Sequence, residues 1–184
     1  MTEKEKMLAG QPYDAGGDLA IDRDIAKDLC FKFNHTLPSK RDEQLKTLQE
    51  LFRTTVTSLN IEAPFLCDYG YNIQLGENVY INHNCIILDC NKITIGNNVF
   101  IAPNVGLYAA YHPIDSTQRN AMIEQSLPIT IEDDCWLGGN VVVLPGVTIG
   151  KGSVIGAGSV VNKDIPPNSL AVGNPCKVIR QINK

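Results

Sequence analysis

A repeat of six residues between positions 131 and 166 constrains the fold of this chain more than any other feature. An aliphatic residue opens each consecutive unit, and the units read IEDDCW, LGGNVV, VLPGVT, IGKGSV, IGAGSV and VNKDIP. An amphipathic helix needs apolar residues three and four positions apart, and a half-buried strand needs alternation, so neither gives a period of six. Hexapeptide repeats are typical of a parallel β-helix, in which each unit forms one flat side and one turn of a coil.

The same phase appears earlier in the chain. The units LGENVY, INHNCI and ILDCNK begin at Leu75, and after a slip of two residues IGNNVF, IAPNVG and LYAAYH follow from Ile95. With three units to a coil, the aliphatic side chains stack one above another inside a triangular prism. The sequence therefore predicts a mainly β fold, a parallel β-helix of hexapeptide repeats that occupies residues 61–184.

Residues 1–60 lack the hexapeptide phase and are predicted to form an N-terminal α-helical cap. A short helix over residues 3–9 is expected to end at Gly10 and Pro12. A second helix is expected from Asp18 until Pro38 breaks it, because apolar residues recur at a spacing of four. These residues are Ile21, Ile25 and Leu29, with Ala26 and Phe33 alongside.

A third helix is expected after Ser39, which has the character of an N-cap residue and is followed by Asp42. Its apolar stripe consists of Leu45, Leu48, Leu51 and Phe52. We expect the apolar stripes of the cap to lie on the coil or on a neighbouring subunit. Gly70 is expected to mark a turn just before the first coil.

A long departure from the hexapeptide register lies between about Ala109 and Pro128. Its polar residues cannot line the prism, so this segment is predicted to project as a loop, and loops on a rigid scaffold are where binding residues concentrate. After the regular units, Pro166 and Pro167 are expected to end the coil. A turn and a short extended or helical tail are predicted over residues 173–180.

Composition excludes several classes of protein. The net charge of −4 gives no reason to expect nucleic acid as a partner, and no apolar run approaches the ~20 residues of a membrane span. The charged start MTEKEK is not a signal peptide, so a cytoplasmic location is the default expectation. The six cysteines form no CxxC pair, and Cys85 and Cys135 occupy the fifth position of their units. We predict small core residues in a reducing compartment rather than metal ligands or disulfides.

Several motifs in order along the chain resemble the sugar O-acetyltransferases of the hexapeptide acyltransferase superfamily. They are DYGYNI (68–73), AAYHPID (109–115), ITIEDDCWLGG (129–139), VNKDIPPN (161–168) and GNPCKVIR (173–180), and the opening EKEKMLAG also fits. The resemblance is greater to the maltose type than to the galactoside or nodulation type. It implies a left-handed β-helix, acetyl-CoA as co-substrate with no metal, and a homotrimer with active sites between subunits.

The resemblance implies that His112 is the general base that takes a proton from a sugar hydroxyl. Unperturbed imidazole has a pKa of about 6.5, so it can accept a proton near neutrality, where the hydroxyl is still protonated. Its position at the root of the projecting loop supports a functional role over a structural one. His83 lies within a regular unit and is a weaker candidate for substrate contact, and His35 is expected to cap or pack against its helix.

The sugar-contacting residues of the family correspond to Asp14, Asp68 and Asn82. Carboxylates and amides suit sugar hydroxyls, which need both donors and acceptors. The galactoside enzymes have serine at the place of Asp68 and a carboxylate at the place of Cys90, so galactoside specificity is not expected. Glu124 is left open: it either orients the imidazole or is an exposed loop carboxylate.

The resemblance assigns the contacts with coenzyme A to seven residues. Trp136 should face outward by its register and lie against the acyl or pantetheine arm, with subunit packing as the alternative role. The small residues give the arm room, and the cationic side chains answer the charge of the phosphates. The remaining residues are Gly139, Ala157, Asn162, Lys163, Lys177 and Arg180.

Three alternative functions differ from sugar acetylation. In the first alternative, the acceptor of the acetyl group is serine, an antibiotic or a nucleotide sugar. This alternative stays open because a shared fold does not fix the substrate. A β-helix carbonic anhydrase would need three histidine ligands for zinc, and only His83 and His112 lie in the coil region. A non-catalytic interaction protein is disfavoured by the loop motif and by the residues assigned to coenzyme A.

Overall fold

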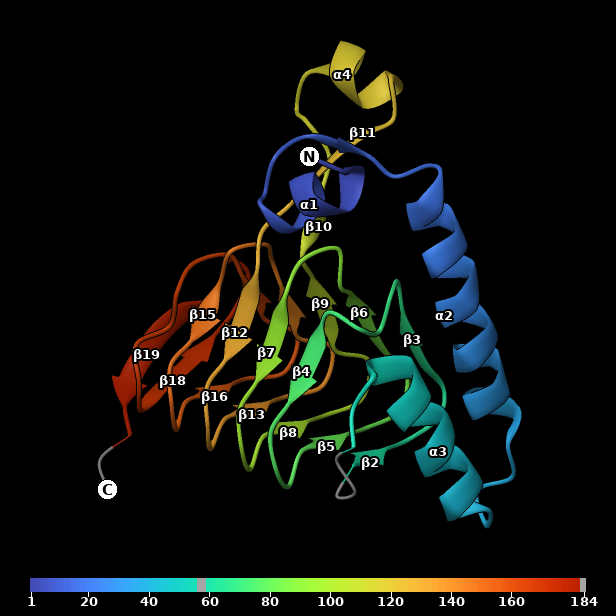
Figure 1. The fold of residues 1–184 in the computed structure, drawn as a ribbon. Helices are drawn as coiled ribbons and strands as arrows, with labels where there is room; N and C mark the ends of the chain where they lie inside the picture. The colour runs from blue at the N-terminus through green and yellow to red at the C-terminus, as the bar shows by residue number, and fades with distance from the viewer. Residues whose placement is uncertain (56–58, 183–184) are drawn as a thin grey trace.

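The computed structural model describes residues 1–55 and 59–182. Its main body is a parallel β-helix, the coil, whose three flat sides are β-sheets, with two long helices at one end and an arm that projects from one edge (Figure 1). No helix among the described residues is long and apolar enough to span a membrane. The predicted division near residue 60 lies beside positions 56–58, which are outside the described residues, and it stays a prediction.

Each side of the coil is a separate sheet. Sheet 1 contains β4 (Ile73–Leu75), β7 (Ile93–Ile95), β12 (Ile129–Ile131) and β15 (Thr148–Ile149). Sheet 2 contains β2 (Asn60–Ile61), β5 (Tyr80–Ile81), β8 (Phe100–Ile101), β13 (Trp136–Leu137), β16 (Val154–Ile155), β18 (Ser169–Val172) and β19 (Lys177–Gln181). Sheet 3 contains β3 (Phe65–Cys67), β6 (Cys85–Leu88), β9 (Gly106–Tyr108), β14 (Val142–Val143) and β17 (Val160–Val161).

The aliphatic residue that opens each unit points into the prism, as the repeat predicted. Parallel pairing places these residues in register from coil to coil, and all of them are buried except Leu75, which is partly buried. The stack in sheet 3, for example, consists of Ile87, Leu107, Val143 and Val161. Cys85 and Cys135 are also buried in this core, which confirms them as small core residues. The interior is therefore a column of apolar side chains that each bury their surface against the next coil.

The fourth position of several units forms the corner between sheets 2 and 3, called here the 2–3 edge. Asn84, Asn104 and Asn140 have φ values of 60°, 61° and 60° at this edge, and Gly158 has 72°. Asparagine and glycine tolerate the left-handed region that other residues avoid, which explains why these two types recur there.

The corner between sheets 3 and 1, called here the 3–1 edge, is wider. The slip of two residues in the repeat falls in its second copy, between β6 and β7. Its third copy is the projecting arm, in which β10 (Ala110–Tyr111) and β11 (Ile123–Ser126) pair antiparallel with α4 (Ser116–Asn120) at the tip. The segment was predicted only as a loop; Asp115 caps α4 by accepting a hydrogen bond from Gln118 N at 3.0 Å.

The N-terminal cap consists of α1 (Glu3–Leu8), β1 (Tyr13–Asp14), α2 (Asp18–His35) and α3 (Arg41–Phe52). Leu48, Leu51 and Phe52 join the core of the first coil, as expected. β1 pairs antiparallel with β11, so the start of the chain is attached to the arm. His35 ends α2 by bonding Phe31 O at 2.8 Å, which confirms its local role.

Three local predictions were wrong. Ile21 and Ile25 are more than half exposed, whereas Ala26 and Phe33 are buried as predicted, together with Leu19 and Cys30. Small Ala26 and Cys30 let the helix lie close to the coil, where the larger isoleucines would hold it away.

Ser39 is not the N-cap of α3, since Lys40 occupies that position without a side-chain cap bond. Pro166 and Pro167 do not end the coil either: β18 adds another parallel strand beside β16. The tail is extended, because β19 pairs antiparallel with β18.

Candidate active site

A pocket of about 310 Å³ lies at the 3–1 edge beside the root of the arm. Successive copies of the same corner contribute its walls, so residues far apart in sequence lie together, and α2 closes one side. The lining residues are Arg23, Asp68, Leu88, Cys90, Ala110, Tyr111, His112 and Glu124. Of the residues predicted from sequence, His112 and Asp68 are brought together here.

The imidazole of His112 is held by the backbone of the arm. Its Nδ1 lies 3.1 Å from Ile123 O, and a carbonyl oxygen can only accept a hydrogen bond, so Nδ1 carries the proton. In the neutral ring this leaves the lone pair on Nε2, the other ring nitrogen. The side chain is exposed, so Nε2 is free to accept a proton from a substrate.

Asp68 follows β3 at the 3–1 edge and places its carboxylate in the pocket. The Cys90 thiol donates a hydrogen bond to Oδ2 of Asp68 at 3.3 Å. Partial burial raises the pKa of Asp68, and the nearby Glu124 carboxylate adds to this, whereas the Cys90 hydrogen bond and Arg23 oppose it. Burial and Asp68 raise the pKa of Cys90, so this cysteine is a neutral donor at neutral pH.

Glu124 does not hold the imidazole. The structure instead pairs its Oε2 with the buried hydroxyl of Tyr13, which donates at 2.8 Å. Tyr13 lies opposite Glu124 in the pairing of β1 with β11, so the N-terminal strand fixes this carboxylate at the pocket wall. Glu124, whose role the sequence left open, is thus bonded to the N-terminal segment rather than to His112.

Sequence reasoning missed Arg23. This residue lies on α2, donates to Tyr69 Oη at 2.7 Å and to Ala15 O at 2.7 Å, and places its guanidinium at the pocket. Nothing in the local sequence distinguishes it from the other charged residues of an amphipathic helix. Only the packing of α2 against the coil reveals it.

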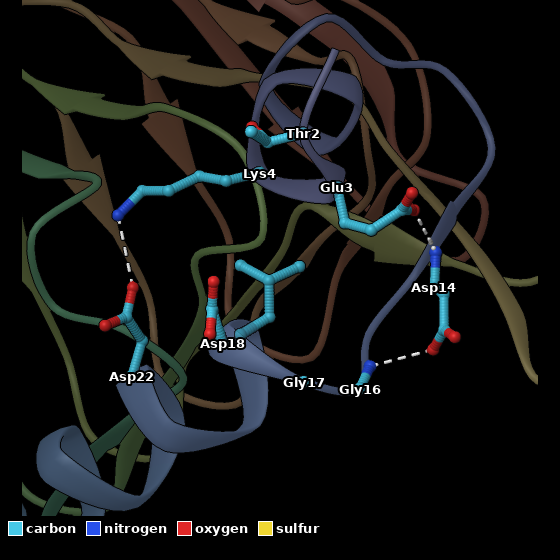
Figure 2. A pocket seen from close by; sticks show the side chains of 9 residues that line it. Thr2, Glu3, Lys4, Asp14, Gly16, Gly17, Asp18 and Asp22 are labelled. Atoms are coloured by element: carbon cyan, nitrogen blue, oxygen red, sulfur yellow. Dashed lines mark hydrogen bonds and ion pairs between the residues drawn. The ribbon is translucent and has the colours of Figure 1, made fainter.

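Asp14 lies elsewhere. It lines a separate pocket between α1 and the start of α2, together with Glu3, Asp18 and Asp22 (Figure 2). Its Oδ1 accepts a hydrogen bond from Gly16 N at 2.8 Å. Its backbone pairs with Ile123, the residue that holds His112, so Asp14 is connected to the candidate site through β1 and β11 without lining it.

The residues assigned to coenzyme A do not line the pocket of His112. Gly139 and Ala157 lie at the 2–3 edge on adjacent coils, where Gly158 N bonds Gly139 O at 2.8 Å, and Asn82 occupies an earlier copy of that edge. Trp136 is 54% exposed on sheet 2, facing outward as its register predicted.

The remaining residues assigned to coenzyme A lie toward the C-terminal end of the coil. Lys177 and Arg180 are exposed on β19, whereas Asn162 and Lys163 are exposed just after β17. His83 bonds Ala63 O through its ring at the 2–3 edge. Within the described residues of one chain, no group of three His, Cys, Asp or Glu side chains is placed to hold a metal ion.

Comparisons with known proteins agree with these observations. Residues 6–55 match the family model described as the maltose acetyltransferase hexapeptide capping motif, and residues 128–163 match the bacterial transferase hexapeptide model of six repeats. A Staphylococcus aureus protein named "Putative acetyltransferase" is 57% identical over 185 residues, covering 100% of this chain and 93% of that protein.

Two solved structures are similar over the full chain. A maltose O-acetyltransferase from Clostridium difficile 630 has 51% identity and a TM-score of 0.97, with 100% of this chain and 99% of that chain covered. A galactoside acetyltransferase solved in complex with coenzyme A has 44% identity and a TM-score of 0.96, with 100% and 92% covered. The chain therefore belongs to the hexapeptide-repeat acetyltransferases of the maltose and galactoside O-acetyltransferase family.

Proposed function

We propose that this protein transfers the acetyl group of acetyl-CoA to a hydroxyl of a sugar of the maltose or glucose type, with His112 as general base. The observation that carries the proposal is the hydrogen bond between His112 Nδ1 and Ile123 O. It leaves Nε2 as the proton acceptor beside a pocket that also contains Asp68, Glu124 and Arg23. Membership of the acetyltransferase family supports the same reaction.

The reaction proceeds by direct attack in a ternary complex. Nε2 of His112 takes the proton as the sugar oxygen attacks the thioester carbonyl, and a tetrahedral oxyanion forms. Backbone N–H groups or a side-chain donor stabilise that oxyanion. The intermediate then collapses, the carbon–sulfur bond breaks, and the imidazolium returns the proton to the thiolate of coenzyme A. A buried, neutral Cys90 is unsuited to carry the acetyl group, which supports a direct transfer.

Polar side chains of both kinds support a sugar as the acceptor. Asp68 and Glu124 accept hydrogen bonds from hydroxyl groups, and the guanidinium of Arg23 donates them. Asp14 and Asn82 remain proposed sugar contacts that lie outside this pocket. We propose that acetyl-CoA contacts Trp136, Gly139, Ala157, Asn162, Lys163, Lys177 and Arg180, in keeping with the coenzyme A complex of the similar galactoside acetyltransferase.

The location of these residues supports a homotrimer with active sites between subunits. His112 and Asp68 lie at the 3–1 edge, whereas Asn82, Gly139 and Ala157 lie at the 2–3 edge, on the opposite side of sheet 3. One chain therefore carries two parts of a site that face different neighbours. A threefold arrangement that brings the 3–1 edge of one subunit to the 2–3 edge of the next would complete each site.

A cytoplasmic location is also proposed. All six cysteines are free thiols among the described residues, and each is buried. Free thiols persist in a reducing compartment, which is also where acetyl-CoA would be met.

The test is acetyl-CoA-dependent release of free coenzyme A, measured with maltose, glucose, galactosides, amino acids and no acceptor. We expect turnover with glucose or maltose, and a loss of ~10²-fold or more in His112→Ala. His35→Ala is the matched control, because His35 is also exposed but bonds only within α2. It should retain wild-type turnover.

The outcomes separate the parts of the proposal. Turnover confined to an amino acid would keep acetyl transfer and reject the sugar. Equal turnover in wild type and His112→Ala, with the oligomer intact, would reject His112 as the base. Absence of both turnover and coenzyme A binding would reject the proposed enzyme activity.

A further inference from the structure

We propose that Asp89, a buried residue that does not line the pocket, is a positioning residue that holds the acceptor-binding wall in place. The wall consists of Asp68 and of the pair Tyr69–Arg23. This inference rests on the proposed function, because it names the residue that fixes the sugar-binding side of that site. Asp89 is 0% exposed and lies at the 3–1 edge directly after β6.

One oxygen of Asp89 holds two backbone groups of the preceding coil. Its Oδ1 accepts hydrogen bonds from Asp68 N at 3.0 Å and from Tyr69 N at 2.8 Å. The backbone oxygen of Asp89 accepts a third hydrogen bond, from Asn72 Nδ2 at 2.7 Å. The turn from Asp68 to Asn72 is therefore tied to Asp89 at both of its ends.

The side chains on that turn form the wall. Asp68 places its carboxylate in the pocket, and the hydroxyl of Tyr69 accepts a hydrogen bond from Arg23, whose guanidinium also lines the pocket. Cys90, next to Asp89 in the chain, donates to the Asp68 carboxylate. A shift of the two amides would consequently move Asp68 and the anchor of Arg23 together.

The chemistry of Asp89 argues against a purely structural residue. Its Oδ2 is buried and has no hydrogen-bond donor among the described residues. Burying a polar oxygen without a partner is unfavourable, and an apolar residue would avoid that cost. Burial also raises the pKa of Asp89 to about 7. A carboxyl or amide oxygen is needed at this position because it accepts hydrogen bonds from the backbone amides of Asp68 and Tyr69, and these residues belong to the pocket wall.

The first test compares the Michaelis constants of three variants. Asp89→Ala removes the acceptor oxygen, and we expect the KM for the sugar to rise about tenfold or more, with the KM for acetyl-CoA within about twofold of wild type. Asp89→Asn keeps a carbonyl oxygen for both amides and should restore the sugar KM to near the wild-type value. Asp89→Ser, which leaves a single hydroxyl, should resemble Asp89→Ala and serves if the alanine variant does not fold.

Ser153→Ala is the control for a merely structural effect. Ser153 is also fully buried and its Oγ accepts from Ser169 N at 3.1 Å, but it lies on the coil away from the pocket. Its loss should lower the melting temperature and leave both KM values unchanged. If Asp89→Ala and Asp89→Ser lower stability and leave the sugar KM unchanged, or raise both KM values equally, the positioning role is wrong.

A double-mutant comparison and a crystal structure complete the test. Because Asp89 acts partly through Asp68, Asp89→Ala should raise the sugar KM by a smaller factor in the Asp68→Ala background than in the wild-type background. Crystal structures of wild type and Asp89→Ser should differ in the positions of Asp68 and Arg23. Unchanged positions of Asp68 and Arg23 would overturn the positioning role of Asp89, whether or not the wild type acetylates a sugar. If the two side chains are displaced but the wild type acetylates no sugar, only the proposed function is rejected.

Discussion

Individual residues of the candidate site are held by hydrogen bonds from other parts of the chain. His112 is oriented by Ile123 O, and Asp68 is fixed through its amide by Asp89. Glu124 is held by Tyr13, more than one hundred residues away in sequence. The site is thus organised before any substrate arrives, which is the condition for efficient proton transfer.

The sequence predicted His112 and Asp68 as site residues, but it did not point to Arg23 or Asp89. His112 and Asp68 lie in motifs that resemble a known family, whereas Arg23 and Asp89 have neighbours only in space. Asp89 sits inside the unit ILDCNK, where its position predicts a corner residue and nothing indicates burial. Contacts between corners of successive coils depend on the exact width of each corner, and the hexapeptide pattern does not specify that width.

Asp89 predicts a pH dependence of stability. Its pKa is about 7 in the folded protein because burial penalises the charged form, and about 3.9 in the unfolded chain. Between these values the folded state binds more protons than the unfolded state, so the stability contributed by protonated Asp89 is lost as pH rises from about 4 to 7. The wild-type protein should therefore lose up to about 4 kcal/mol relative to Asp89→Asn across that range.

Urea unfolding of both proteins at pH 4.5, 6.0 and 7.5, at equal concentration, measures this difference. The neighbouring Asp68 carboxylate is retained in both proteins, so its own titration largely cancels in the comparison. Parallel stability curves for wild type and Asp89→Asn would show that Asp89 titrates at its ordinary pKa.

Among the structural elements, the coil followed its repeat and the flanking segments did not. The period of six places the first and fifth side chains of each regular unit inward, and that requirement fixes which face of each short strand is buried. The N-cap of α3, the buried face of α2 and the end of the coil were mispredicted, because each depends on tertiary packing. The hairpin of the arm, formed by β10 and β11, was also unpredicted. Its strand β11 pairs in addition with β1 from the start of the chain, a contact between segments that are distant in sequence.

Two adjacent valines on β14 test the packing of the coil. Val143 is fully buried in the stack of sheet 3, whereas Val142 faces outward and is half-buried. Val143→Ala removes two methyl groups from the column and should lower the free energy of unfolding by about 2 kcal/mol. Val142→Ala, the matched control, should cost less than about 1 kcal/mol in the same urea titration. Equal losses would contradict the assigned inward and outward faces.

At the scale of the whole molecule, the chain separates the parts of the proposed site. The pocket of His112 lies at the 3–1 edge, and Trp136 lies on sheet 2, one full side of the prism away. The resemblance to known acetyltransferases predicted a trimer from sequence, together with the left-handed sense of the coil, which ordinary crossover rules do not favour. Periodicity alone predicted neither feature, because it describes how coils stack and not how subunits meet.

The most direct test of this account mixes two inactive subunits. His112→Ala and Trp136→Ala are co-expressed with different affinity tags, and the species that carries both tags is assayed for acetyl-CoA-dependent sugar acetylation. Each site needs an intact His112 from one subunit and an intact Trp136 from the next, and in a trimer that contains both variants about one site in three meets this condition. A site shared between subunits predicts about a third of wild-type activity. It predicts no recovery when His112→Ala is mixed with Asp68→Ala, because both changes affect the same pocket. Activity no higher than that of either parent in the first mixture would contradict a site shared between subunits.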